Sequence, residues 1–150
     1  MKTLNAFSLL EIVVVMGILV AVALIVLPLT VNQLQEARSE VVAADISSLL
    51  FAAQQDAYAR KDGKSYGIFF ETNQYTLFIG DSYGTAESTD VVTLPDNVTI
   101  SNIGLASGDE IAYLSGNFRP EDNGTLNITE GTQTYQINID PEGLIDFYPL

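Results

Sequence analysis

A run of apolar residues near the N-terminus is the feature that most constrains this chain. Between Asn5 and Leu29 the only charged residue is Glu11, and the stretch from Ile12 to Leu29 carries no charge at all. One helix needs roughly 20 apolar residues to cross a hydrocarbon core about 30 Å thick. We therefore predict a long N-terminal helix with a transmembrane first half.

Glu11 is the residue of this run that needs an explanation. A carboxylate inside a bilayer costs on the order of 2.5–3.5 kcal/mol, so such residues tend to have a partner and a function. The alternative is that Glu11 lies at headgroup depth and is simply solvated. If the chain is cut between Ala6 and Phe7, the new α-amino group, with a pKa of about 8, is largely charged at neutral pH. It stands four residues before Glu11, and residues four apart share a helix face. Cleavage would therefore supply a cation for this carboxylate, in its own chain or in a neighbouring one.

The N-terminal residues resemble the type IV prepilin signature, in which a short basic leader and a small residue precede Phe-Ser-Leu-Leu-Glu and an apolar helix. The resemblance implies that the membrane prepilin peptidase cuts after Ala6 and N-methylates Phe7. It also implies that Glu11 is the family's signature glutamate, needed for assembly, and that Pro28 is its helix-kinking proline. Two departures stand out: Ala6 replaces the usual glycine, and Val20 lies where many pilins have a helix-loosening glycine.

Lys2 is the only charge in the expected leader, residues 1–6. Positive residues favour the cytoplasmic side of a membrane, which places everything after Leu29 outside the cytoplasm. A cleavable secretory signal is the competing interpretation, but its apolar core would be about 7–15 residues long and would end at a small-x-small site. We therefore expect a single-pass protein of the bacterial inner membrane with an extracytoplasmic C-terminal domain, which later joins a pilus or pseudopilus.

Composition excludes several kinds of chemistry. The chain has no Cys and no His, which removes disulfides, thiolate catalysis and the commonest general base and metal ligand. No nucleophile and base pattern is visible, so an enzyme is the least favoured class.

The net charge is −13, and Arg119 is the only basic residue after Lys64. Because nucleic acid binding depends on Lys and Arg, the acidic domain should repel DNA. Its charge favours cationic partners or ions, or is simply a solvated surface.

From Val31 to about Arg60 the pattern becomes amphipathic. Charged residues such as Asp45 and Asp56 lie mostly away from an apolar stripe, which consists of Val42, Ile46, Leu49, Leu50, Ala53 and Ala57. We interpret the stripe as a face packed on a domain core. A coiled coil is the alternative, although small residues such as Ala52 interrupt a clean heptad. The cations around Lys61 and the glycine Gly63 are expected to close the helix.

Beyond the helix the period changes to two, which indicates strands. We expect strands at residues 66–70, 74–79, 91–94, 98–100, 111–114, 125–128, 134–139 and 144–148. The fold class is therefore α+β, a long N-terminal helix packed on a small antiparallel β-sheet or sandwich. The expected organisation is a leader at 1–6, a transmembrane and filament-core helix at 7–29, its amphipathic continuation at 30–62 and a β-rich domain at 63–150.

A weaker resemblance extends along the β-rich part. Leu94-Pro95, the segment from Phe118 to Gly124 and the closing hairpin through residues 140–143 are similar to H-type pseudopilins and FimT-like minor pilins. The resemblance implies a pilin-like fold and membership of a filament. In the FimT-like group, DNA capture uses basic residues near the C-terminus. The hairpin here carries Asp140, Glu142 and Asp146 instead, which argues against that role.

The acidic loops could hold calcium, which binds six to eight oxygens. The candidates are residues 81–90, 109–110, 121–123 and 140–142, none of which matches an EF-hand loop. Solvated turns are the default interpretation, and no cofactor is expected.

The function predicted from the sequence is a structural subunit, a minor pilin or pseudopilin, of a type IV pilus or a type II secretion pseudopilus. Its expected partners are other pilin or pseudopilin subunits, the prepilin peptidase, an inner-membrane assembly platform and the membrane. Two alternatives remain open: a membrane-anchored binding module for a cationic ligand or calcium, and a DNA-uptake minor pilin.

Overall fold

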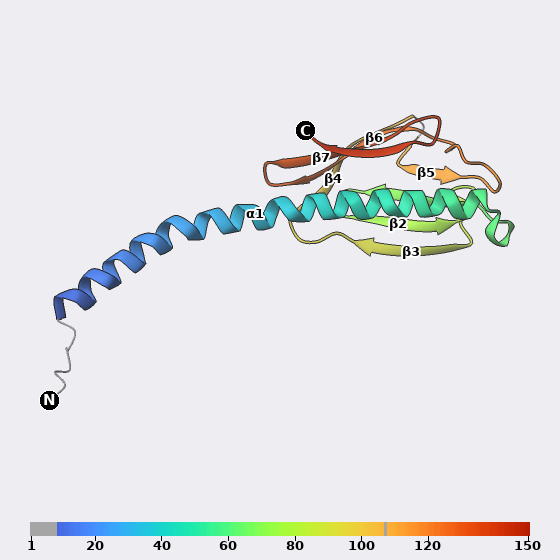
Figure 1. The fold of residues 1–150 in the computed structure, drawn as a ribbon. Helices are drawn as coiled ribbons and strands as arrows, with labels where there is room; N and C mark the ends of the chain where they lie inside the picture. The colour runs from blue at the N-terminus through green and yellow to red at the C-terminus, as the bar shows by residue number, and fades with distance from the viewer. Residues whose placement is uncertain (1–8, 107) are drawn as a thin grey trace. The chain divides into compact units, whose positions relative to one another are not determined.

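The computed structural model of the chain describes residues 9–106 and 108–150, and the side chains of these residues except for 24–37. By its internal contacts the chain divides into an N-terminal unit that ends at Gln35 and a C-terminal unit, Glu36–Leu150. Helix α1, Leu9–Tyr58, contributes to both (Figure 1).

In the N-terminal unit the described side chains of α1 are exposed at every position from 9 to 23. Its large apolar residues range from 50% exposed at Val15 to 81% exposed at Leu9. Apolar surface on all sides of a helix is typical of a segment covered by lipid or by other proteins. Among the residues that the structure describes, however, no helix meets the length and hydropathy needed to cross a membrane. The membrane span expected over residues 7–29 stays a prediction.

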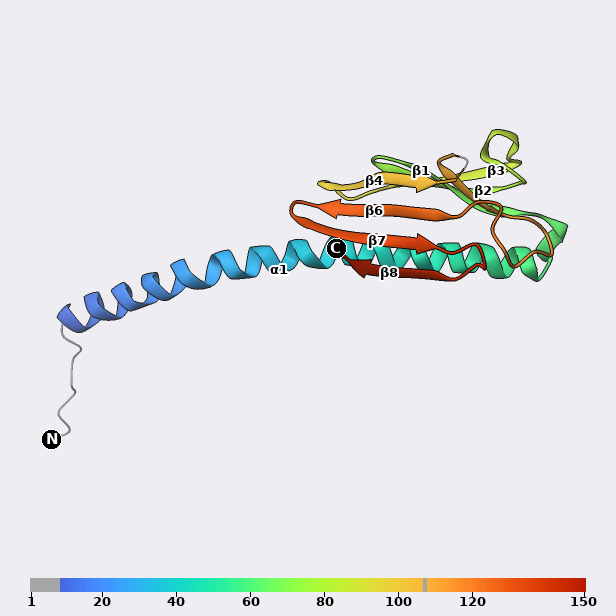
Figure 2. The same cartoon turned by 90° about the horizontal axis from the view of Figure 1, so that it is seen from above.

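The C-terminal unit contains two antiparallel sheets (Figures 1 and 2). The first has the order β3-β2-β1-β5 and the second the order β4-β6-β7-β8. The strands are β1 (Tyr66–Glu71), β2 (Gln74–Ile79), β3 (Ser88–Thr93), β4 (Val98–Leu105), β5 (Glu110–Tyr113), β6 (Gly124–Glu130), β7 (Gln133–Ile139) and β8 (Ile145–Pro149). Every strand expected from the period-two pattern is present, and β3, β4 and β6 are at least two residues longer than expected. The predicted α+β class is confirmed.

The amphipathic part of α1 supplies one side of the core. Val42, Ile46 and Leu50 are buried, as the sequence stripe predicts. They join one apolar cluster with strand residues of both sheets, among them Ile68, Phe70, Tyr75, Ile111, Tyr113, Leu126, Ile128, Ile137 and Ile139. Burying one large apolar side chain contributes roughly 1.5–3 kcal/mol, so this cluster holds the helix on the sheets. Leu49 is only partly buried, because it lies on the side of the stripe that faces an open groove.

The end of α1 differs from the sequence expectation. The sequence predicts Gly63 as the left-handed closing residue, but Arg60 takes that role, with φ 53°, and Gly63 lies in the short helix Lys61–Gly63 that follows. The carbonyl of Ala57 accepts hydrogen bonds from Arg60 N at 3.0 Å and from Gly116 N at 2.8 Å. A loop distant in sequence therefore supplies a hydrogen-bond donor to a terminal carbonyl of the helix. The helix ends where that loop packs against it.

Gln54 connects the helix to two loops through hydrogen bonds. Its side chain is fully buried, and Nε2 donates to the carbonyl of Phe118 at 2.9 Å and to the carbonyl of Gly143 at 2.7 Å. Gly143 has φ 90°, and a Cβ there would lie 2.6 Å from Gln54 Nε2. The turn between β7 and β8 can therefore approach the helix only with glycine at this position.

The outer face of the first sheet is covered by the loop that contains the short helix Tyr83–Thr85. The ring of Tyr83 stacks on Phe69 with centroids 4.2 Å apart and meets Phe78 edge-on at 6.1 Å. Phe78 in turn lies over Gly67, where a Cβ would overlap Phe78 Cζ. The absence of a side chain at Gly67 is thus a packing requirement of this face.

We expect Gln54→Leu to lower the free energy of unfolding by about 1–3 kcal/mol, because two buried carbonyls lose their donor. Urea denaturation of the detergent-solubilised chain, followed by tyrosine fluorescence, measures it. Gln55→Leu is the matched control, since Gln55 is the exposed neighbour of the same chemistry. Equal changes in the two variants would show that the contacts of Gln54 contribute nothing.

We expect Gly67→Ala to destabilise the fold by about 1–3 kcal/mol, because the new methyl group overlaps the Phe78 ring and the carbonyl of Ile111. Gly84→Ala serves as the control, since a Cβ at Gly84 meets nothing within 4 Å. The same denaturation assay compares them, and a Gly67 variant as stable as the Gly84 variant would refute the packing role.

Candidate functional site

The residues predicted from the sequence to act in processing and assembly lie at the N-terminal end. Lys2, Ala6 and Phe7 fall outside the described residues, so cleavage, methylation and the leader charge stay predictions. Glu11 lies in the first turn of the described helix, beside a surface hollow that it lines with Ile12, Val15 and Met16. Helix α1 runs through position 28, where the side chain of Pro28 is not described, and the predicted kink is untested.

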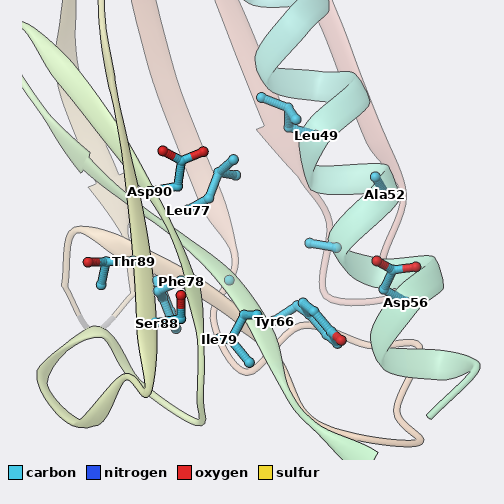
Figure 3. Close-up of a pocket in the computed structure, with 12 residues that line it drawn as sticks. Leu49, Ala52, Asp56, Tyr66, Leu77, Phe78, Ile79, Ser88, Thr89 and Asp90 are labelled. Atoms are coloured by element: carbon cyan, nitrogen blue, oxygen red, sulfur yellow. The ribbon is translucent and has the colours of Figure 1, made fainter. Parts of the chain in front are cut away.

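A groove in the C-terminal unit is the site that the sequence analysis missed. It lies between the last turns of α1 and the strands β1, β2 and β3, and has a volume of about 260 Å³ (Figure 3). The helix side is formed by Leu49, Ala52, Ala53 and Asp56, and the sheet side by Tyr66, Gly67, Leu77, Phe78, Ile79, Ser88, Thr89 and Asp90. The sequence signal was the spacing of Leu49, Ala52 and Asp56, which puts one large, one small and one charged residue on the same helix side.

Side-chain size explains why the groove is open. Ala52 and Ala53 offer only methyl groups to the space above β2. On β3, Asp90 pairs with Leu77 and Ser88 pairs with Ile79, so a polar side chain stands beside each apolar one. Directly paired residues lie on the same face of a sheet. The result is an apolar floor with polar groups along its outer side, as Figure 3 shows for Leu77 and Asp90.

Carboxylates stand on both sides of this floor. Asp56 comes from α1 and Asp90 from β3. The side chain of Asp90 makes no hydrogen bond or ion pair with any described residue. A third acid, Asp45, lies further back along the helix, close enough to Tyr75 of β2 that it adds to burial in raising the pKa of the Tyr75 hydroxyl. The groove is therefore apolar within, with the carboxylate of Asp90, unpaired among the described residues, on the sheet side and the carboxylate of Asp56, paired with Lys61, on the helix side.

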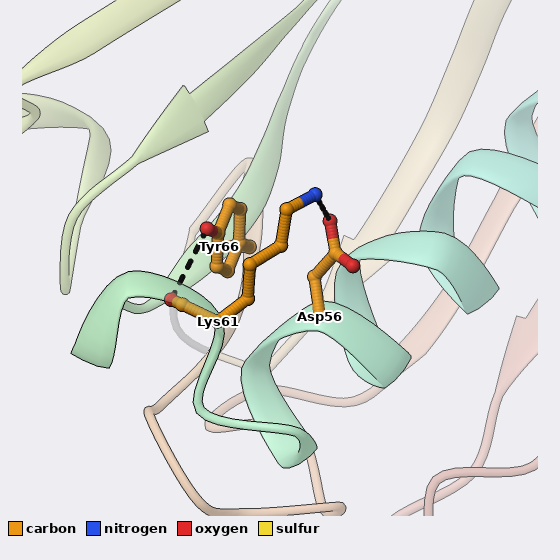
Figure 4. A network of polar contacts seen from close by, with 3 residues as sticks. All are labelled: Asp56, Lys61 and Tyr66. Carbon is orange, nitrogen blue, oxygen red and sulfur yellow. Dashed lines mark hydrogen bonds and ion pairs between the residues drawn. The ribbon is translucent and has the colours of Figure 1, made fainter.

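One ammonium group already lies at this rim. Lys61 Nζ contacts Asp56 Oδ2 at 2.6 Å and stands 5.9 Å from the centre of the Tyr66 ring (Figure 4). The Tyr66 hydroxyl donates to the carbonyl of Lys61 at 3.3 Å, which fixes the turn beside the helix end. The hydrogen bond to Asp56 is the main cause that raises the pKa of Lys61.

The acidic loops considered for calcium use their carboxylates locally. Asp81 accepts a hydrogen bond from Ser65 Oγ at 2.6 Å, and Glu110 accepts one from Tyr83 N at 2.8 Å. Glu142 pairs with Arg119. Among the described residues no group of three or more acidic, His or Cys side chains is placed to hold a metal ion.

No model of a known protein family matches the chain, and no curated protein matches it. Two solved structures of the minor pseudopilin EpsH, from the type 2 secretion system of Vibrio cholerae, resemble it. One has a TM-score of 0.57 at 14% sequence identity and covers 75% of this chain and 97% of the EpsH chain. The other has a TM-score of 0.58 at 13% identity and covers 75% of this chain and 94% of that chain. The chain therefore has the fold of these minor pseudopilins, which confirms at the level of fold the pseudopilin resemblance found in the sequence.

Proposed function

We propose that this protein is a structural subunit, a minor pilin or pseudopilin, of a type II secretion pseudopilus or a type IV pilus. Its fold, shared with EpsH over 75% of the chain, is the observation that carries the proposal. The N-terminal sequence supports it, because a leader, a cut site and Glu11 follow one another in the prepilin order. An enzymatic role has no support from either.

The exposed apolar part of α1 supplies the means of assembly. Side chains from Leu9 to Ala23 leave a large apolar surface uncovered within the described chain, and such surface is stable only in lipid or against other proteins. Before assembly, residues 7–29 hold the protein in the inner membrane. After assembly, the same residues pack against those of neighbouring subunits in the filament.

Glu11 sets the register of this packing. Prepilin peptidase removes residues 1–6 and exposes a charged amine at Phe7. The carboxylate of Glu11 in one subunit then attracts the amine of an incoming subunit, and the low dielectric of the filament core strengthens this attraction relative to water. Assembly is thereby favoured only after cleavage, so we expect processing to precede incorporation.

The charge of the C-terminal unit argues against a nucleic acid partner. The ion pair with Glu142 engages Arg119, the one cation beyond Lys64. A domain with so few cations cannot neutralise several phosphates. The pilus or pseudopilus role is thus favoured over DNA uptake.

We expect Glu11→Ala to leave membrane insertion and cleavage intact while filament incorporation falls about tenfold or more. Losing about 1.4 kcal/mol at each docking step already gives a factor of ten. Immunoblots of sheared filaments and of membranes measure the two populations. Glu121→Ala, which removes an exposed acid of the C-terminal unit, is the control. Incorporation of Glu11→Ala at the wild-type level would contradict this role.

We expect Ala6→Leu to block processing, because the residue before the cut must be small for the peptidase. Mass spectrometry of the membrane-extracted protein should find methylated Phe7 as the first residue of the wild type and residues 1–6 still present in the variant. Leu4→Ile, which changes the leader away from the cut, should be processed normally. A variant whose mature chain still begins at Phe7 would disprove the assigned cut.

A further inference from the structure

Strand β3 is an edge strand with an unused side. It pairs with β2 and with no other described strand. Leu94 N donates to the carbonyl of Asn73 directly opposite it. Hydrogen-bonded and non-hydrogen-bonded pairs alternate along an antiparallel ladder, so the main-chain groups of Thr89, Val91 and Thr93 point away from β2. Such a row of free donors and acceptors is a template for another strand.

The strand is also poorly covered by side chains. All its residues are exposed except Val92, and Val91 is 53% exposed. Exposed edges are normally protected by lysine, proline, a bulge or an inward-pointing charge. Of these β3 has Asp90, a charge that repels acidic strands and attracts basic ones. Between Ser88 and Thr93 the sequence has no lysine and no proline. The pairing of β3 with β2 is regular over the same residues, without a bulge.

The groove beside this edge has a particular chemistry. Its floor is formed by Leu77 and Ile79, and its sides carry Asp56 and Asp90. A lysine or arginine side chain matches this arrangement, because its stem is apolar and its head is charged. The contact of Lys61 with Asp56 shows that the rim accommodates an ammonium group.

From these observations we propose that the groove and the free edge of β3 together bind an extended, basic segment of another protein. The segment adds a strand to β3 through Thr89, Val91 and Thr93. Its Lys or Arg side chains lie across Leu77 and Ile79 and bring their charged heads to Asp90, the acid of the groove that has no partner among the described residues. Main-chain hydrogen bonds supply affinity, and the acidic groove selects the side chains, as in other cases of strand addition.

Charge decides between the possible occupants of this edge. A second copy of the chain carries the same net charge of −13, so its approach to a groove lined with carboxylates is repelled. A basic segment is attracted and steered toward the groove. The occupant is therefore a strand from a different, cationic polypeptide. This inference stands apart from the filament proposal, because it uses only contacts within the C-terminal unit.

The test is a peptide titration of the full-length protein in detergent micelles. The probe is a capped peptide of alternating lysine and valine with roughly six residues, the usual strand length, at physiological salt. Calorimetry measures its affinity, with a glutamate and valine peptide as the charge-reversed probe. We expect the lysine peptide to bind and the glutamate peptide not to bind. Equal binding of both peptides, or of neither, would overturn the proposal.

Two variants examine the two halves of the site. Asp90→Asn removes one charge of the groove without changing the size of the side chain. It should lower the affinity for the lysine peptide about tenfold, a loss of about 1.4 kcal/mol in binding free energy. Asp96→Asn removes an exposed charge in the turn after β3 and should leave the affinity unchanged. Equal affinities for these two variants would mean that the acidic surface attracts the peptide without a site.

Val91→Pro removes an amide that the fold does not use, since the N–H of Val91 points away from β2. Proline is tolerated at such edge positions, and the tyrosine fluorescence of the unbound protein confirms that the domain remains folded. We expect this variant to lose peptide binding altogether. Binding at the wild-type level would exclude strand addition, and the Asp90→Asn comparison decides the case if the proline variant fails to fold.

Discussion

The packing of one stripe of α1 against two sheets is the constraint on which the C-terminal unit depends. Ile46 and Leu50 are completely buried at this contact, and the apolar cluster they join contains residues of both sheets. Without the helix, the inner faces of both sheets would expose their isoleucines to water. At roughly 25 cal/mol for each Å² of apolar surface, the cost would exceed the modest net stability of a domain of this size.

The same packing produces the groove. Alanines at positions 52 and 53 present only methyl groups to the sheet, so they cannot fill the space above the outer part of β2. Leu49 is left partly buried as a result. The edge strand β3 then lies beyond the reach of the helix, with its carboxylate Asp90 beside apolar Leu77. The helix therefore packs tightly against the core on one side, and on its other side it borders a groove with an apolar floor and acidic residues at its edges.

Much of the fold was predictable from local patterns. Strands appear where residues alternate, as in β6 and β7, because one face of each strand is more deeply buried than the other. The helix stripe was predictable for the same reason, since Val42, Ile46 and Leu50 recur at helical spacing. The role of the buried Gln54 was not predictable, because nothing in the neighbouring sequence indicates the two distant carbonyls to which its side chain donates. The groove escaped prediction too, since Asp56 and Asp90 are far apart in sequence and each alone is indistinguishable from a solvated acid.

By itself the sequence determined that the chain contains an apolar run holding one acid, that a helix leads into a β-rich part, and that the β-rich part is acidic. These properties depend on composition and on neighbours a few residues away. Only the tertiary structure decided where α1 closes, because Gly116 N reaches the carbonyl of Ala57 from a distant loop. It also decided which strand remains at the edge, and that this edge borders a groove with carboxylates on both sides. Such features arise from contacts between residues remote in sequence, whose positions are set by the packing of the whole core.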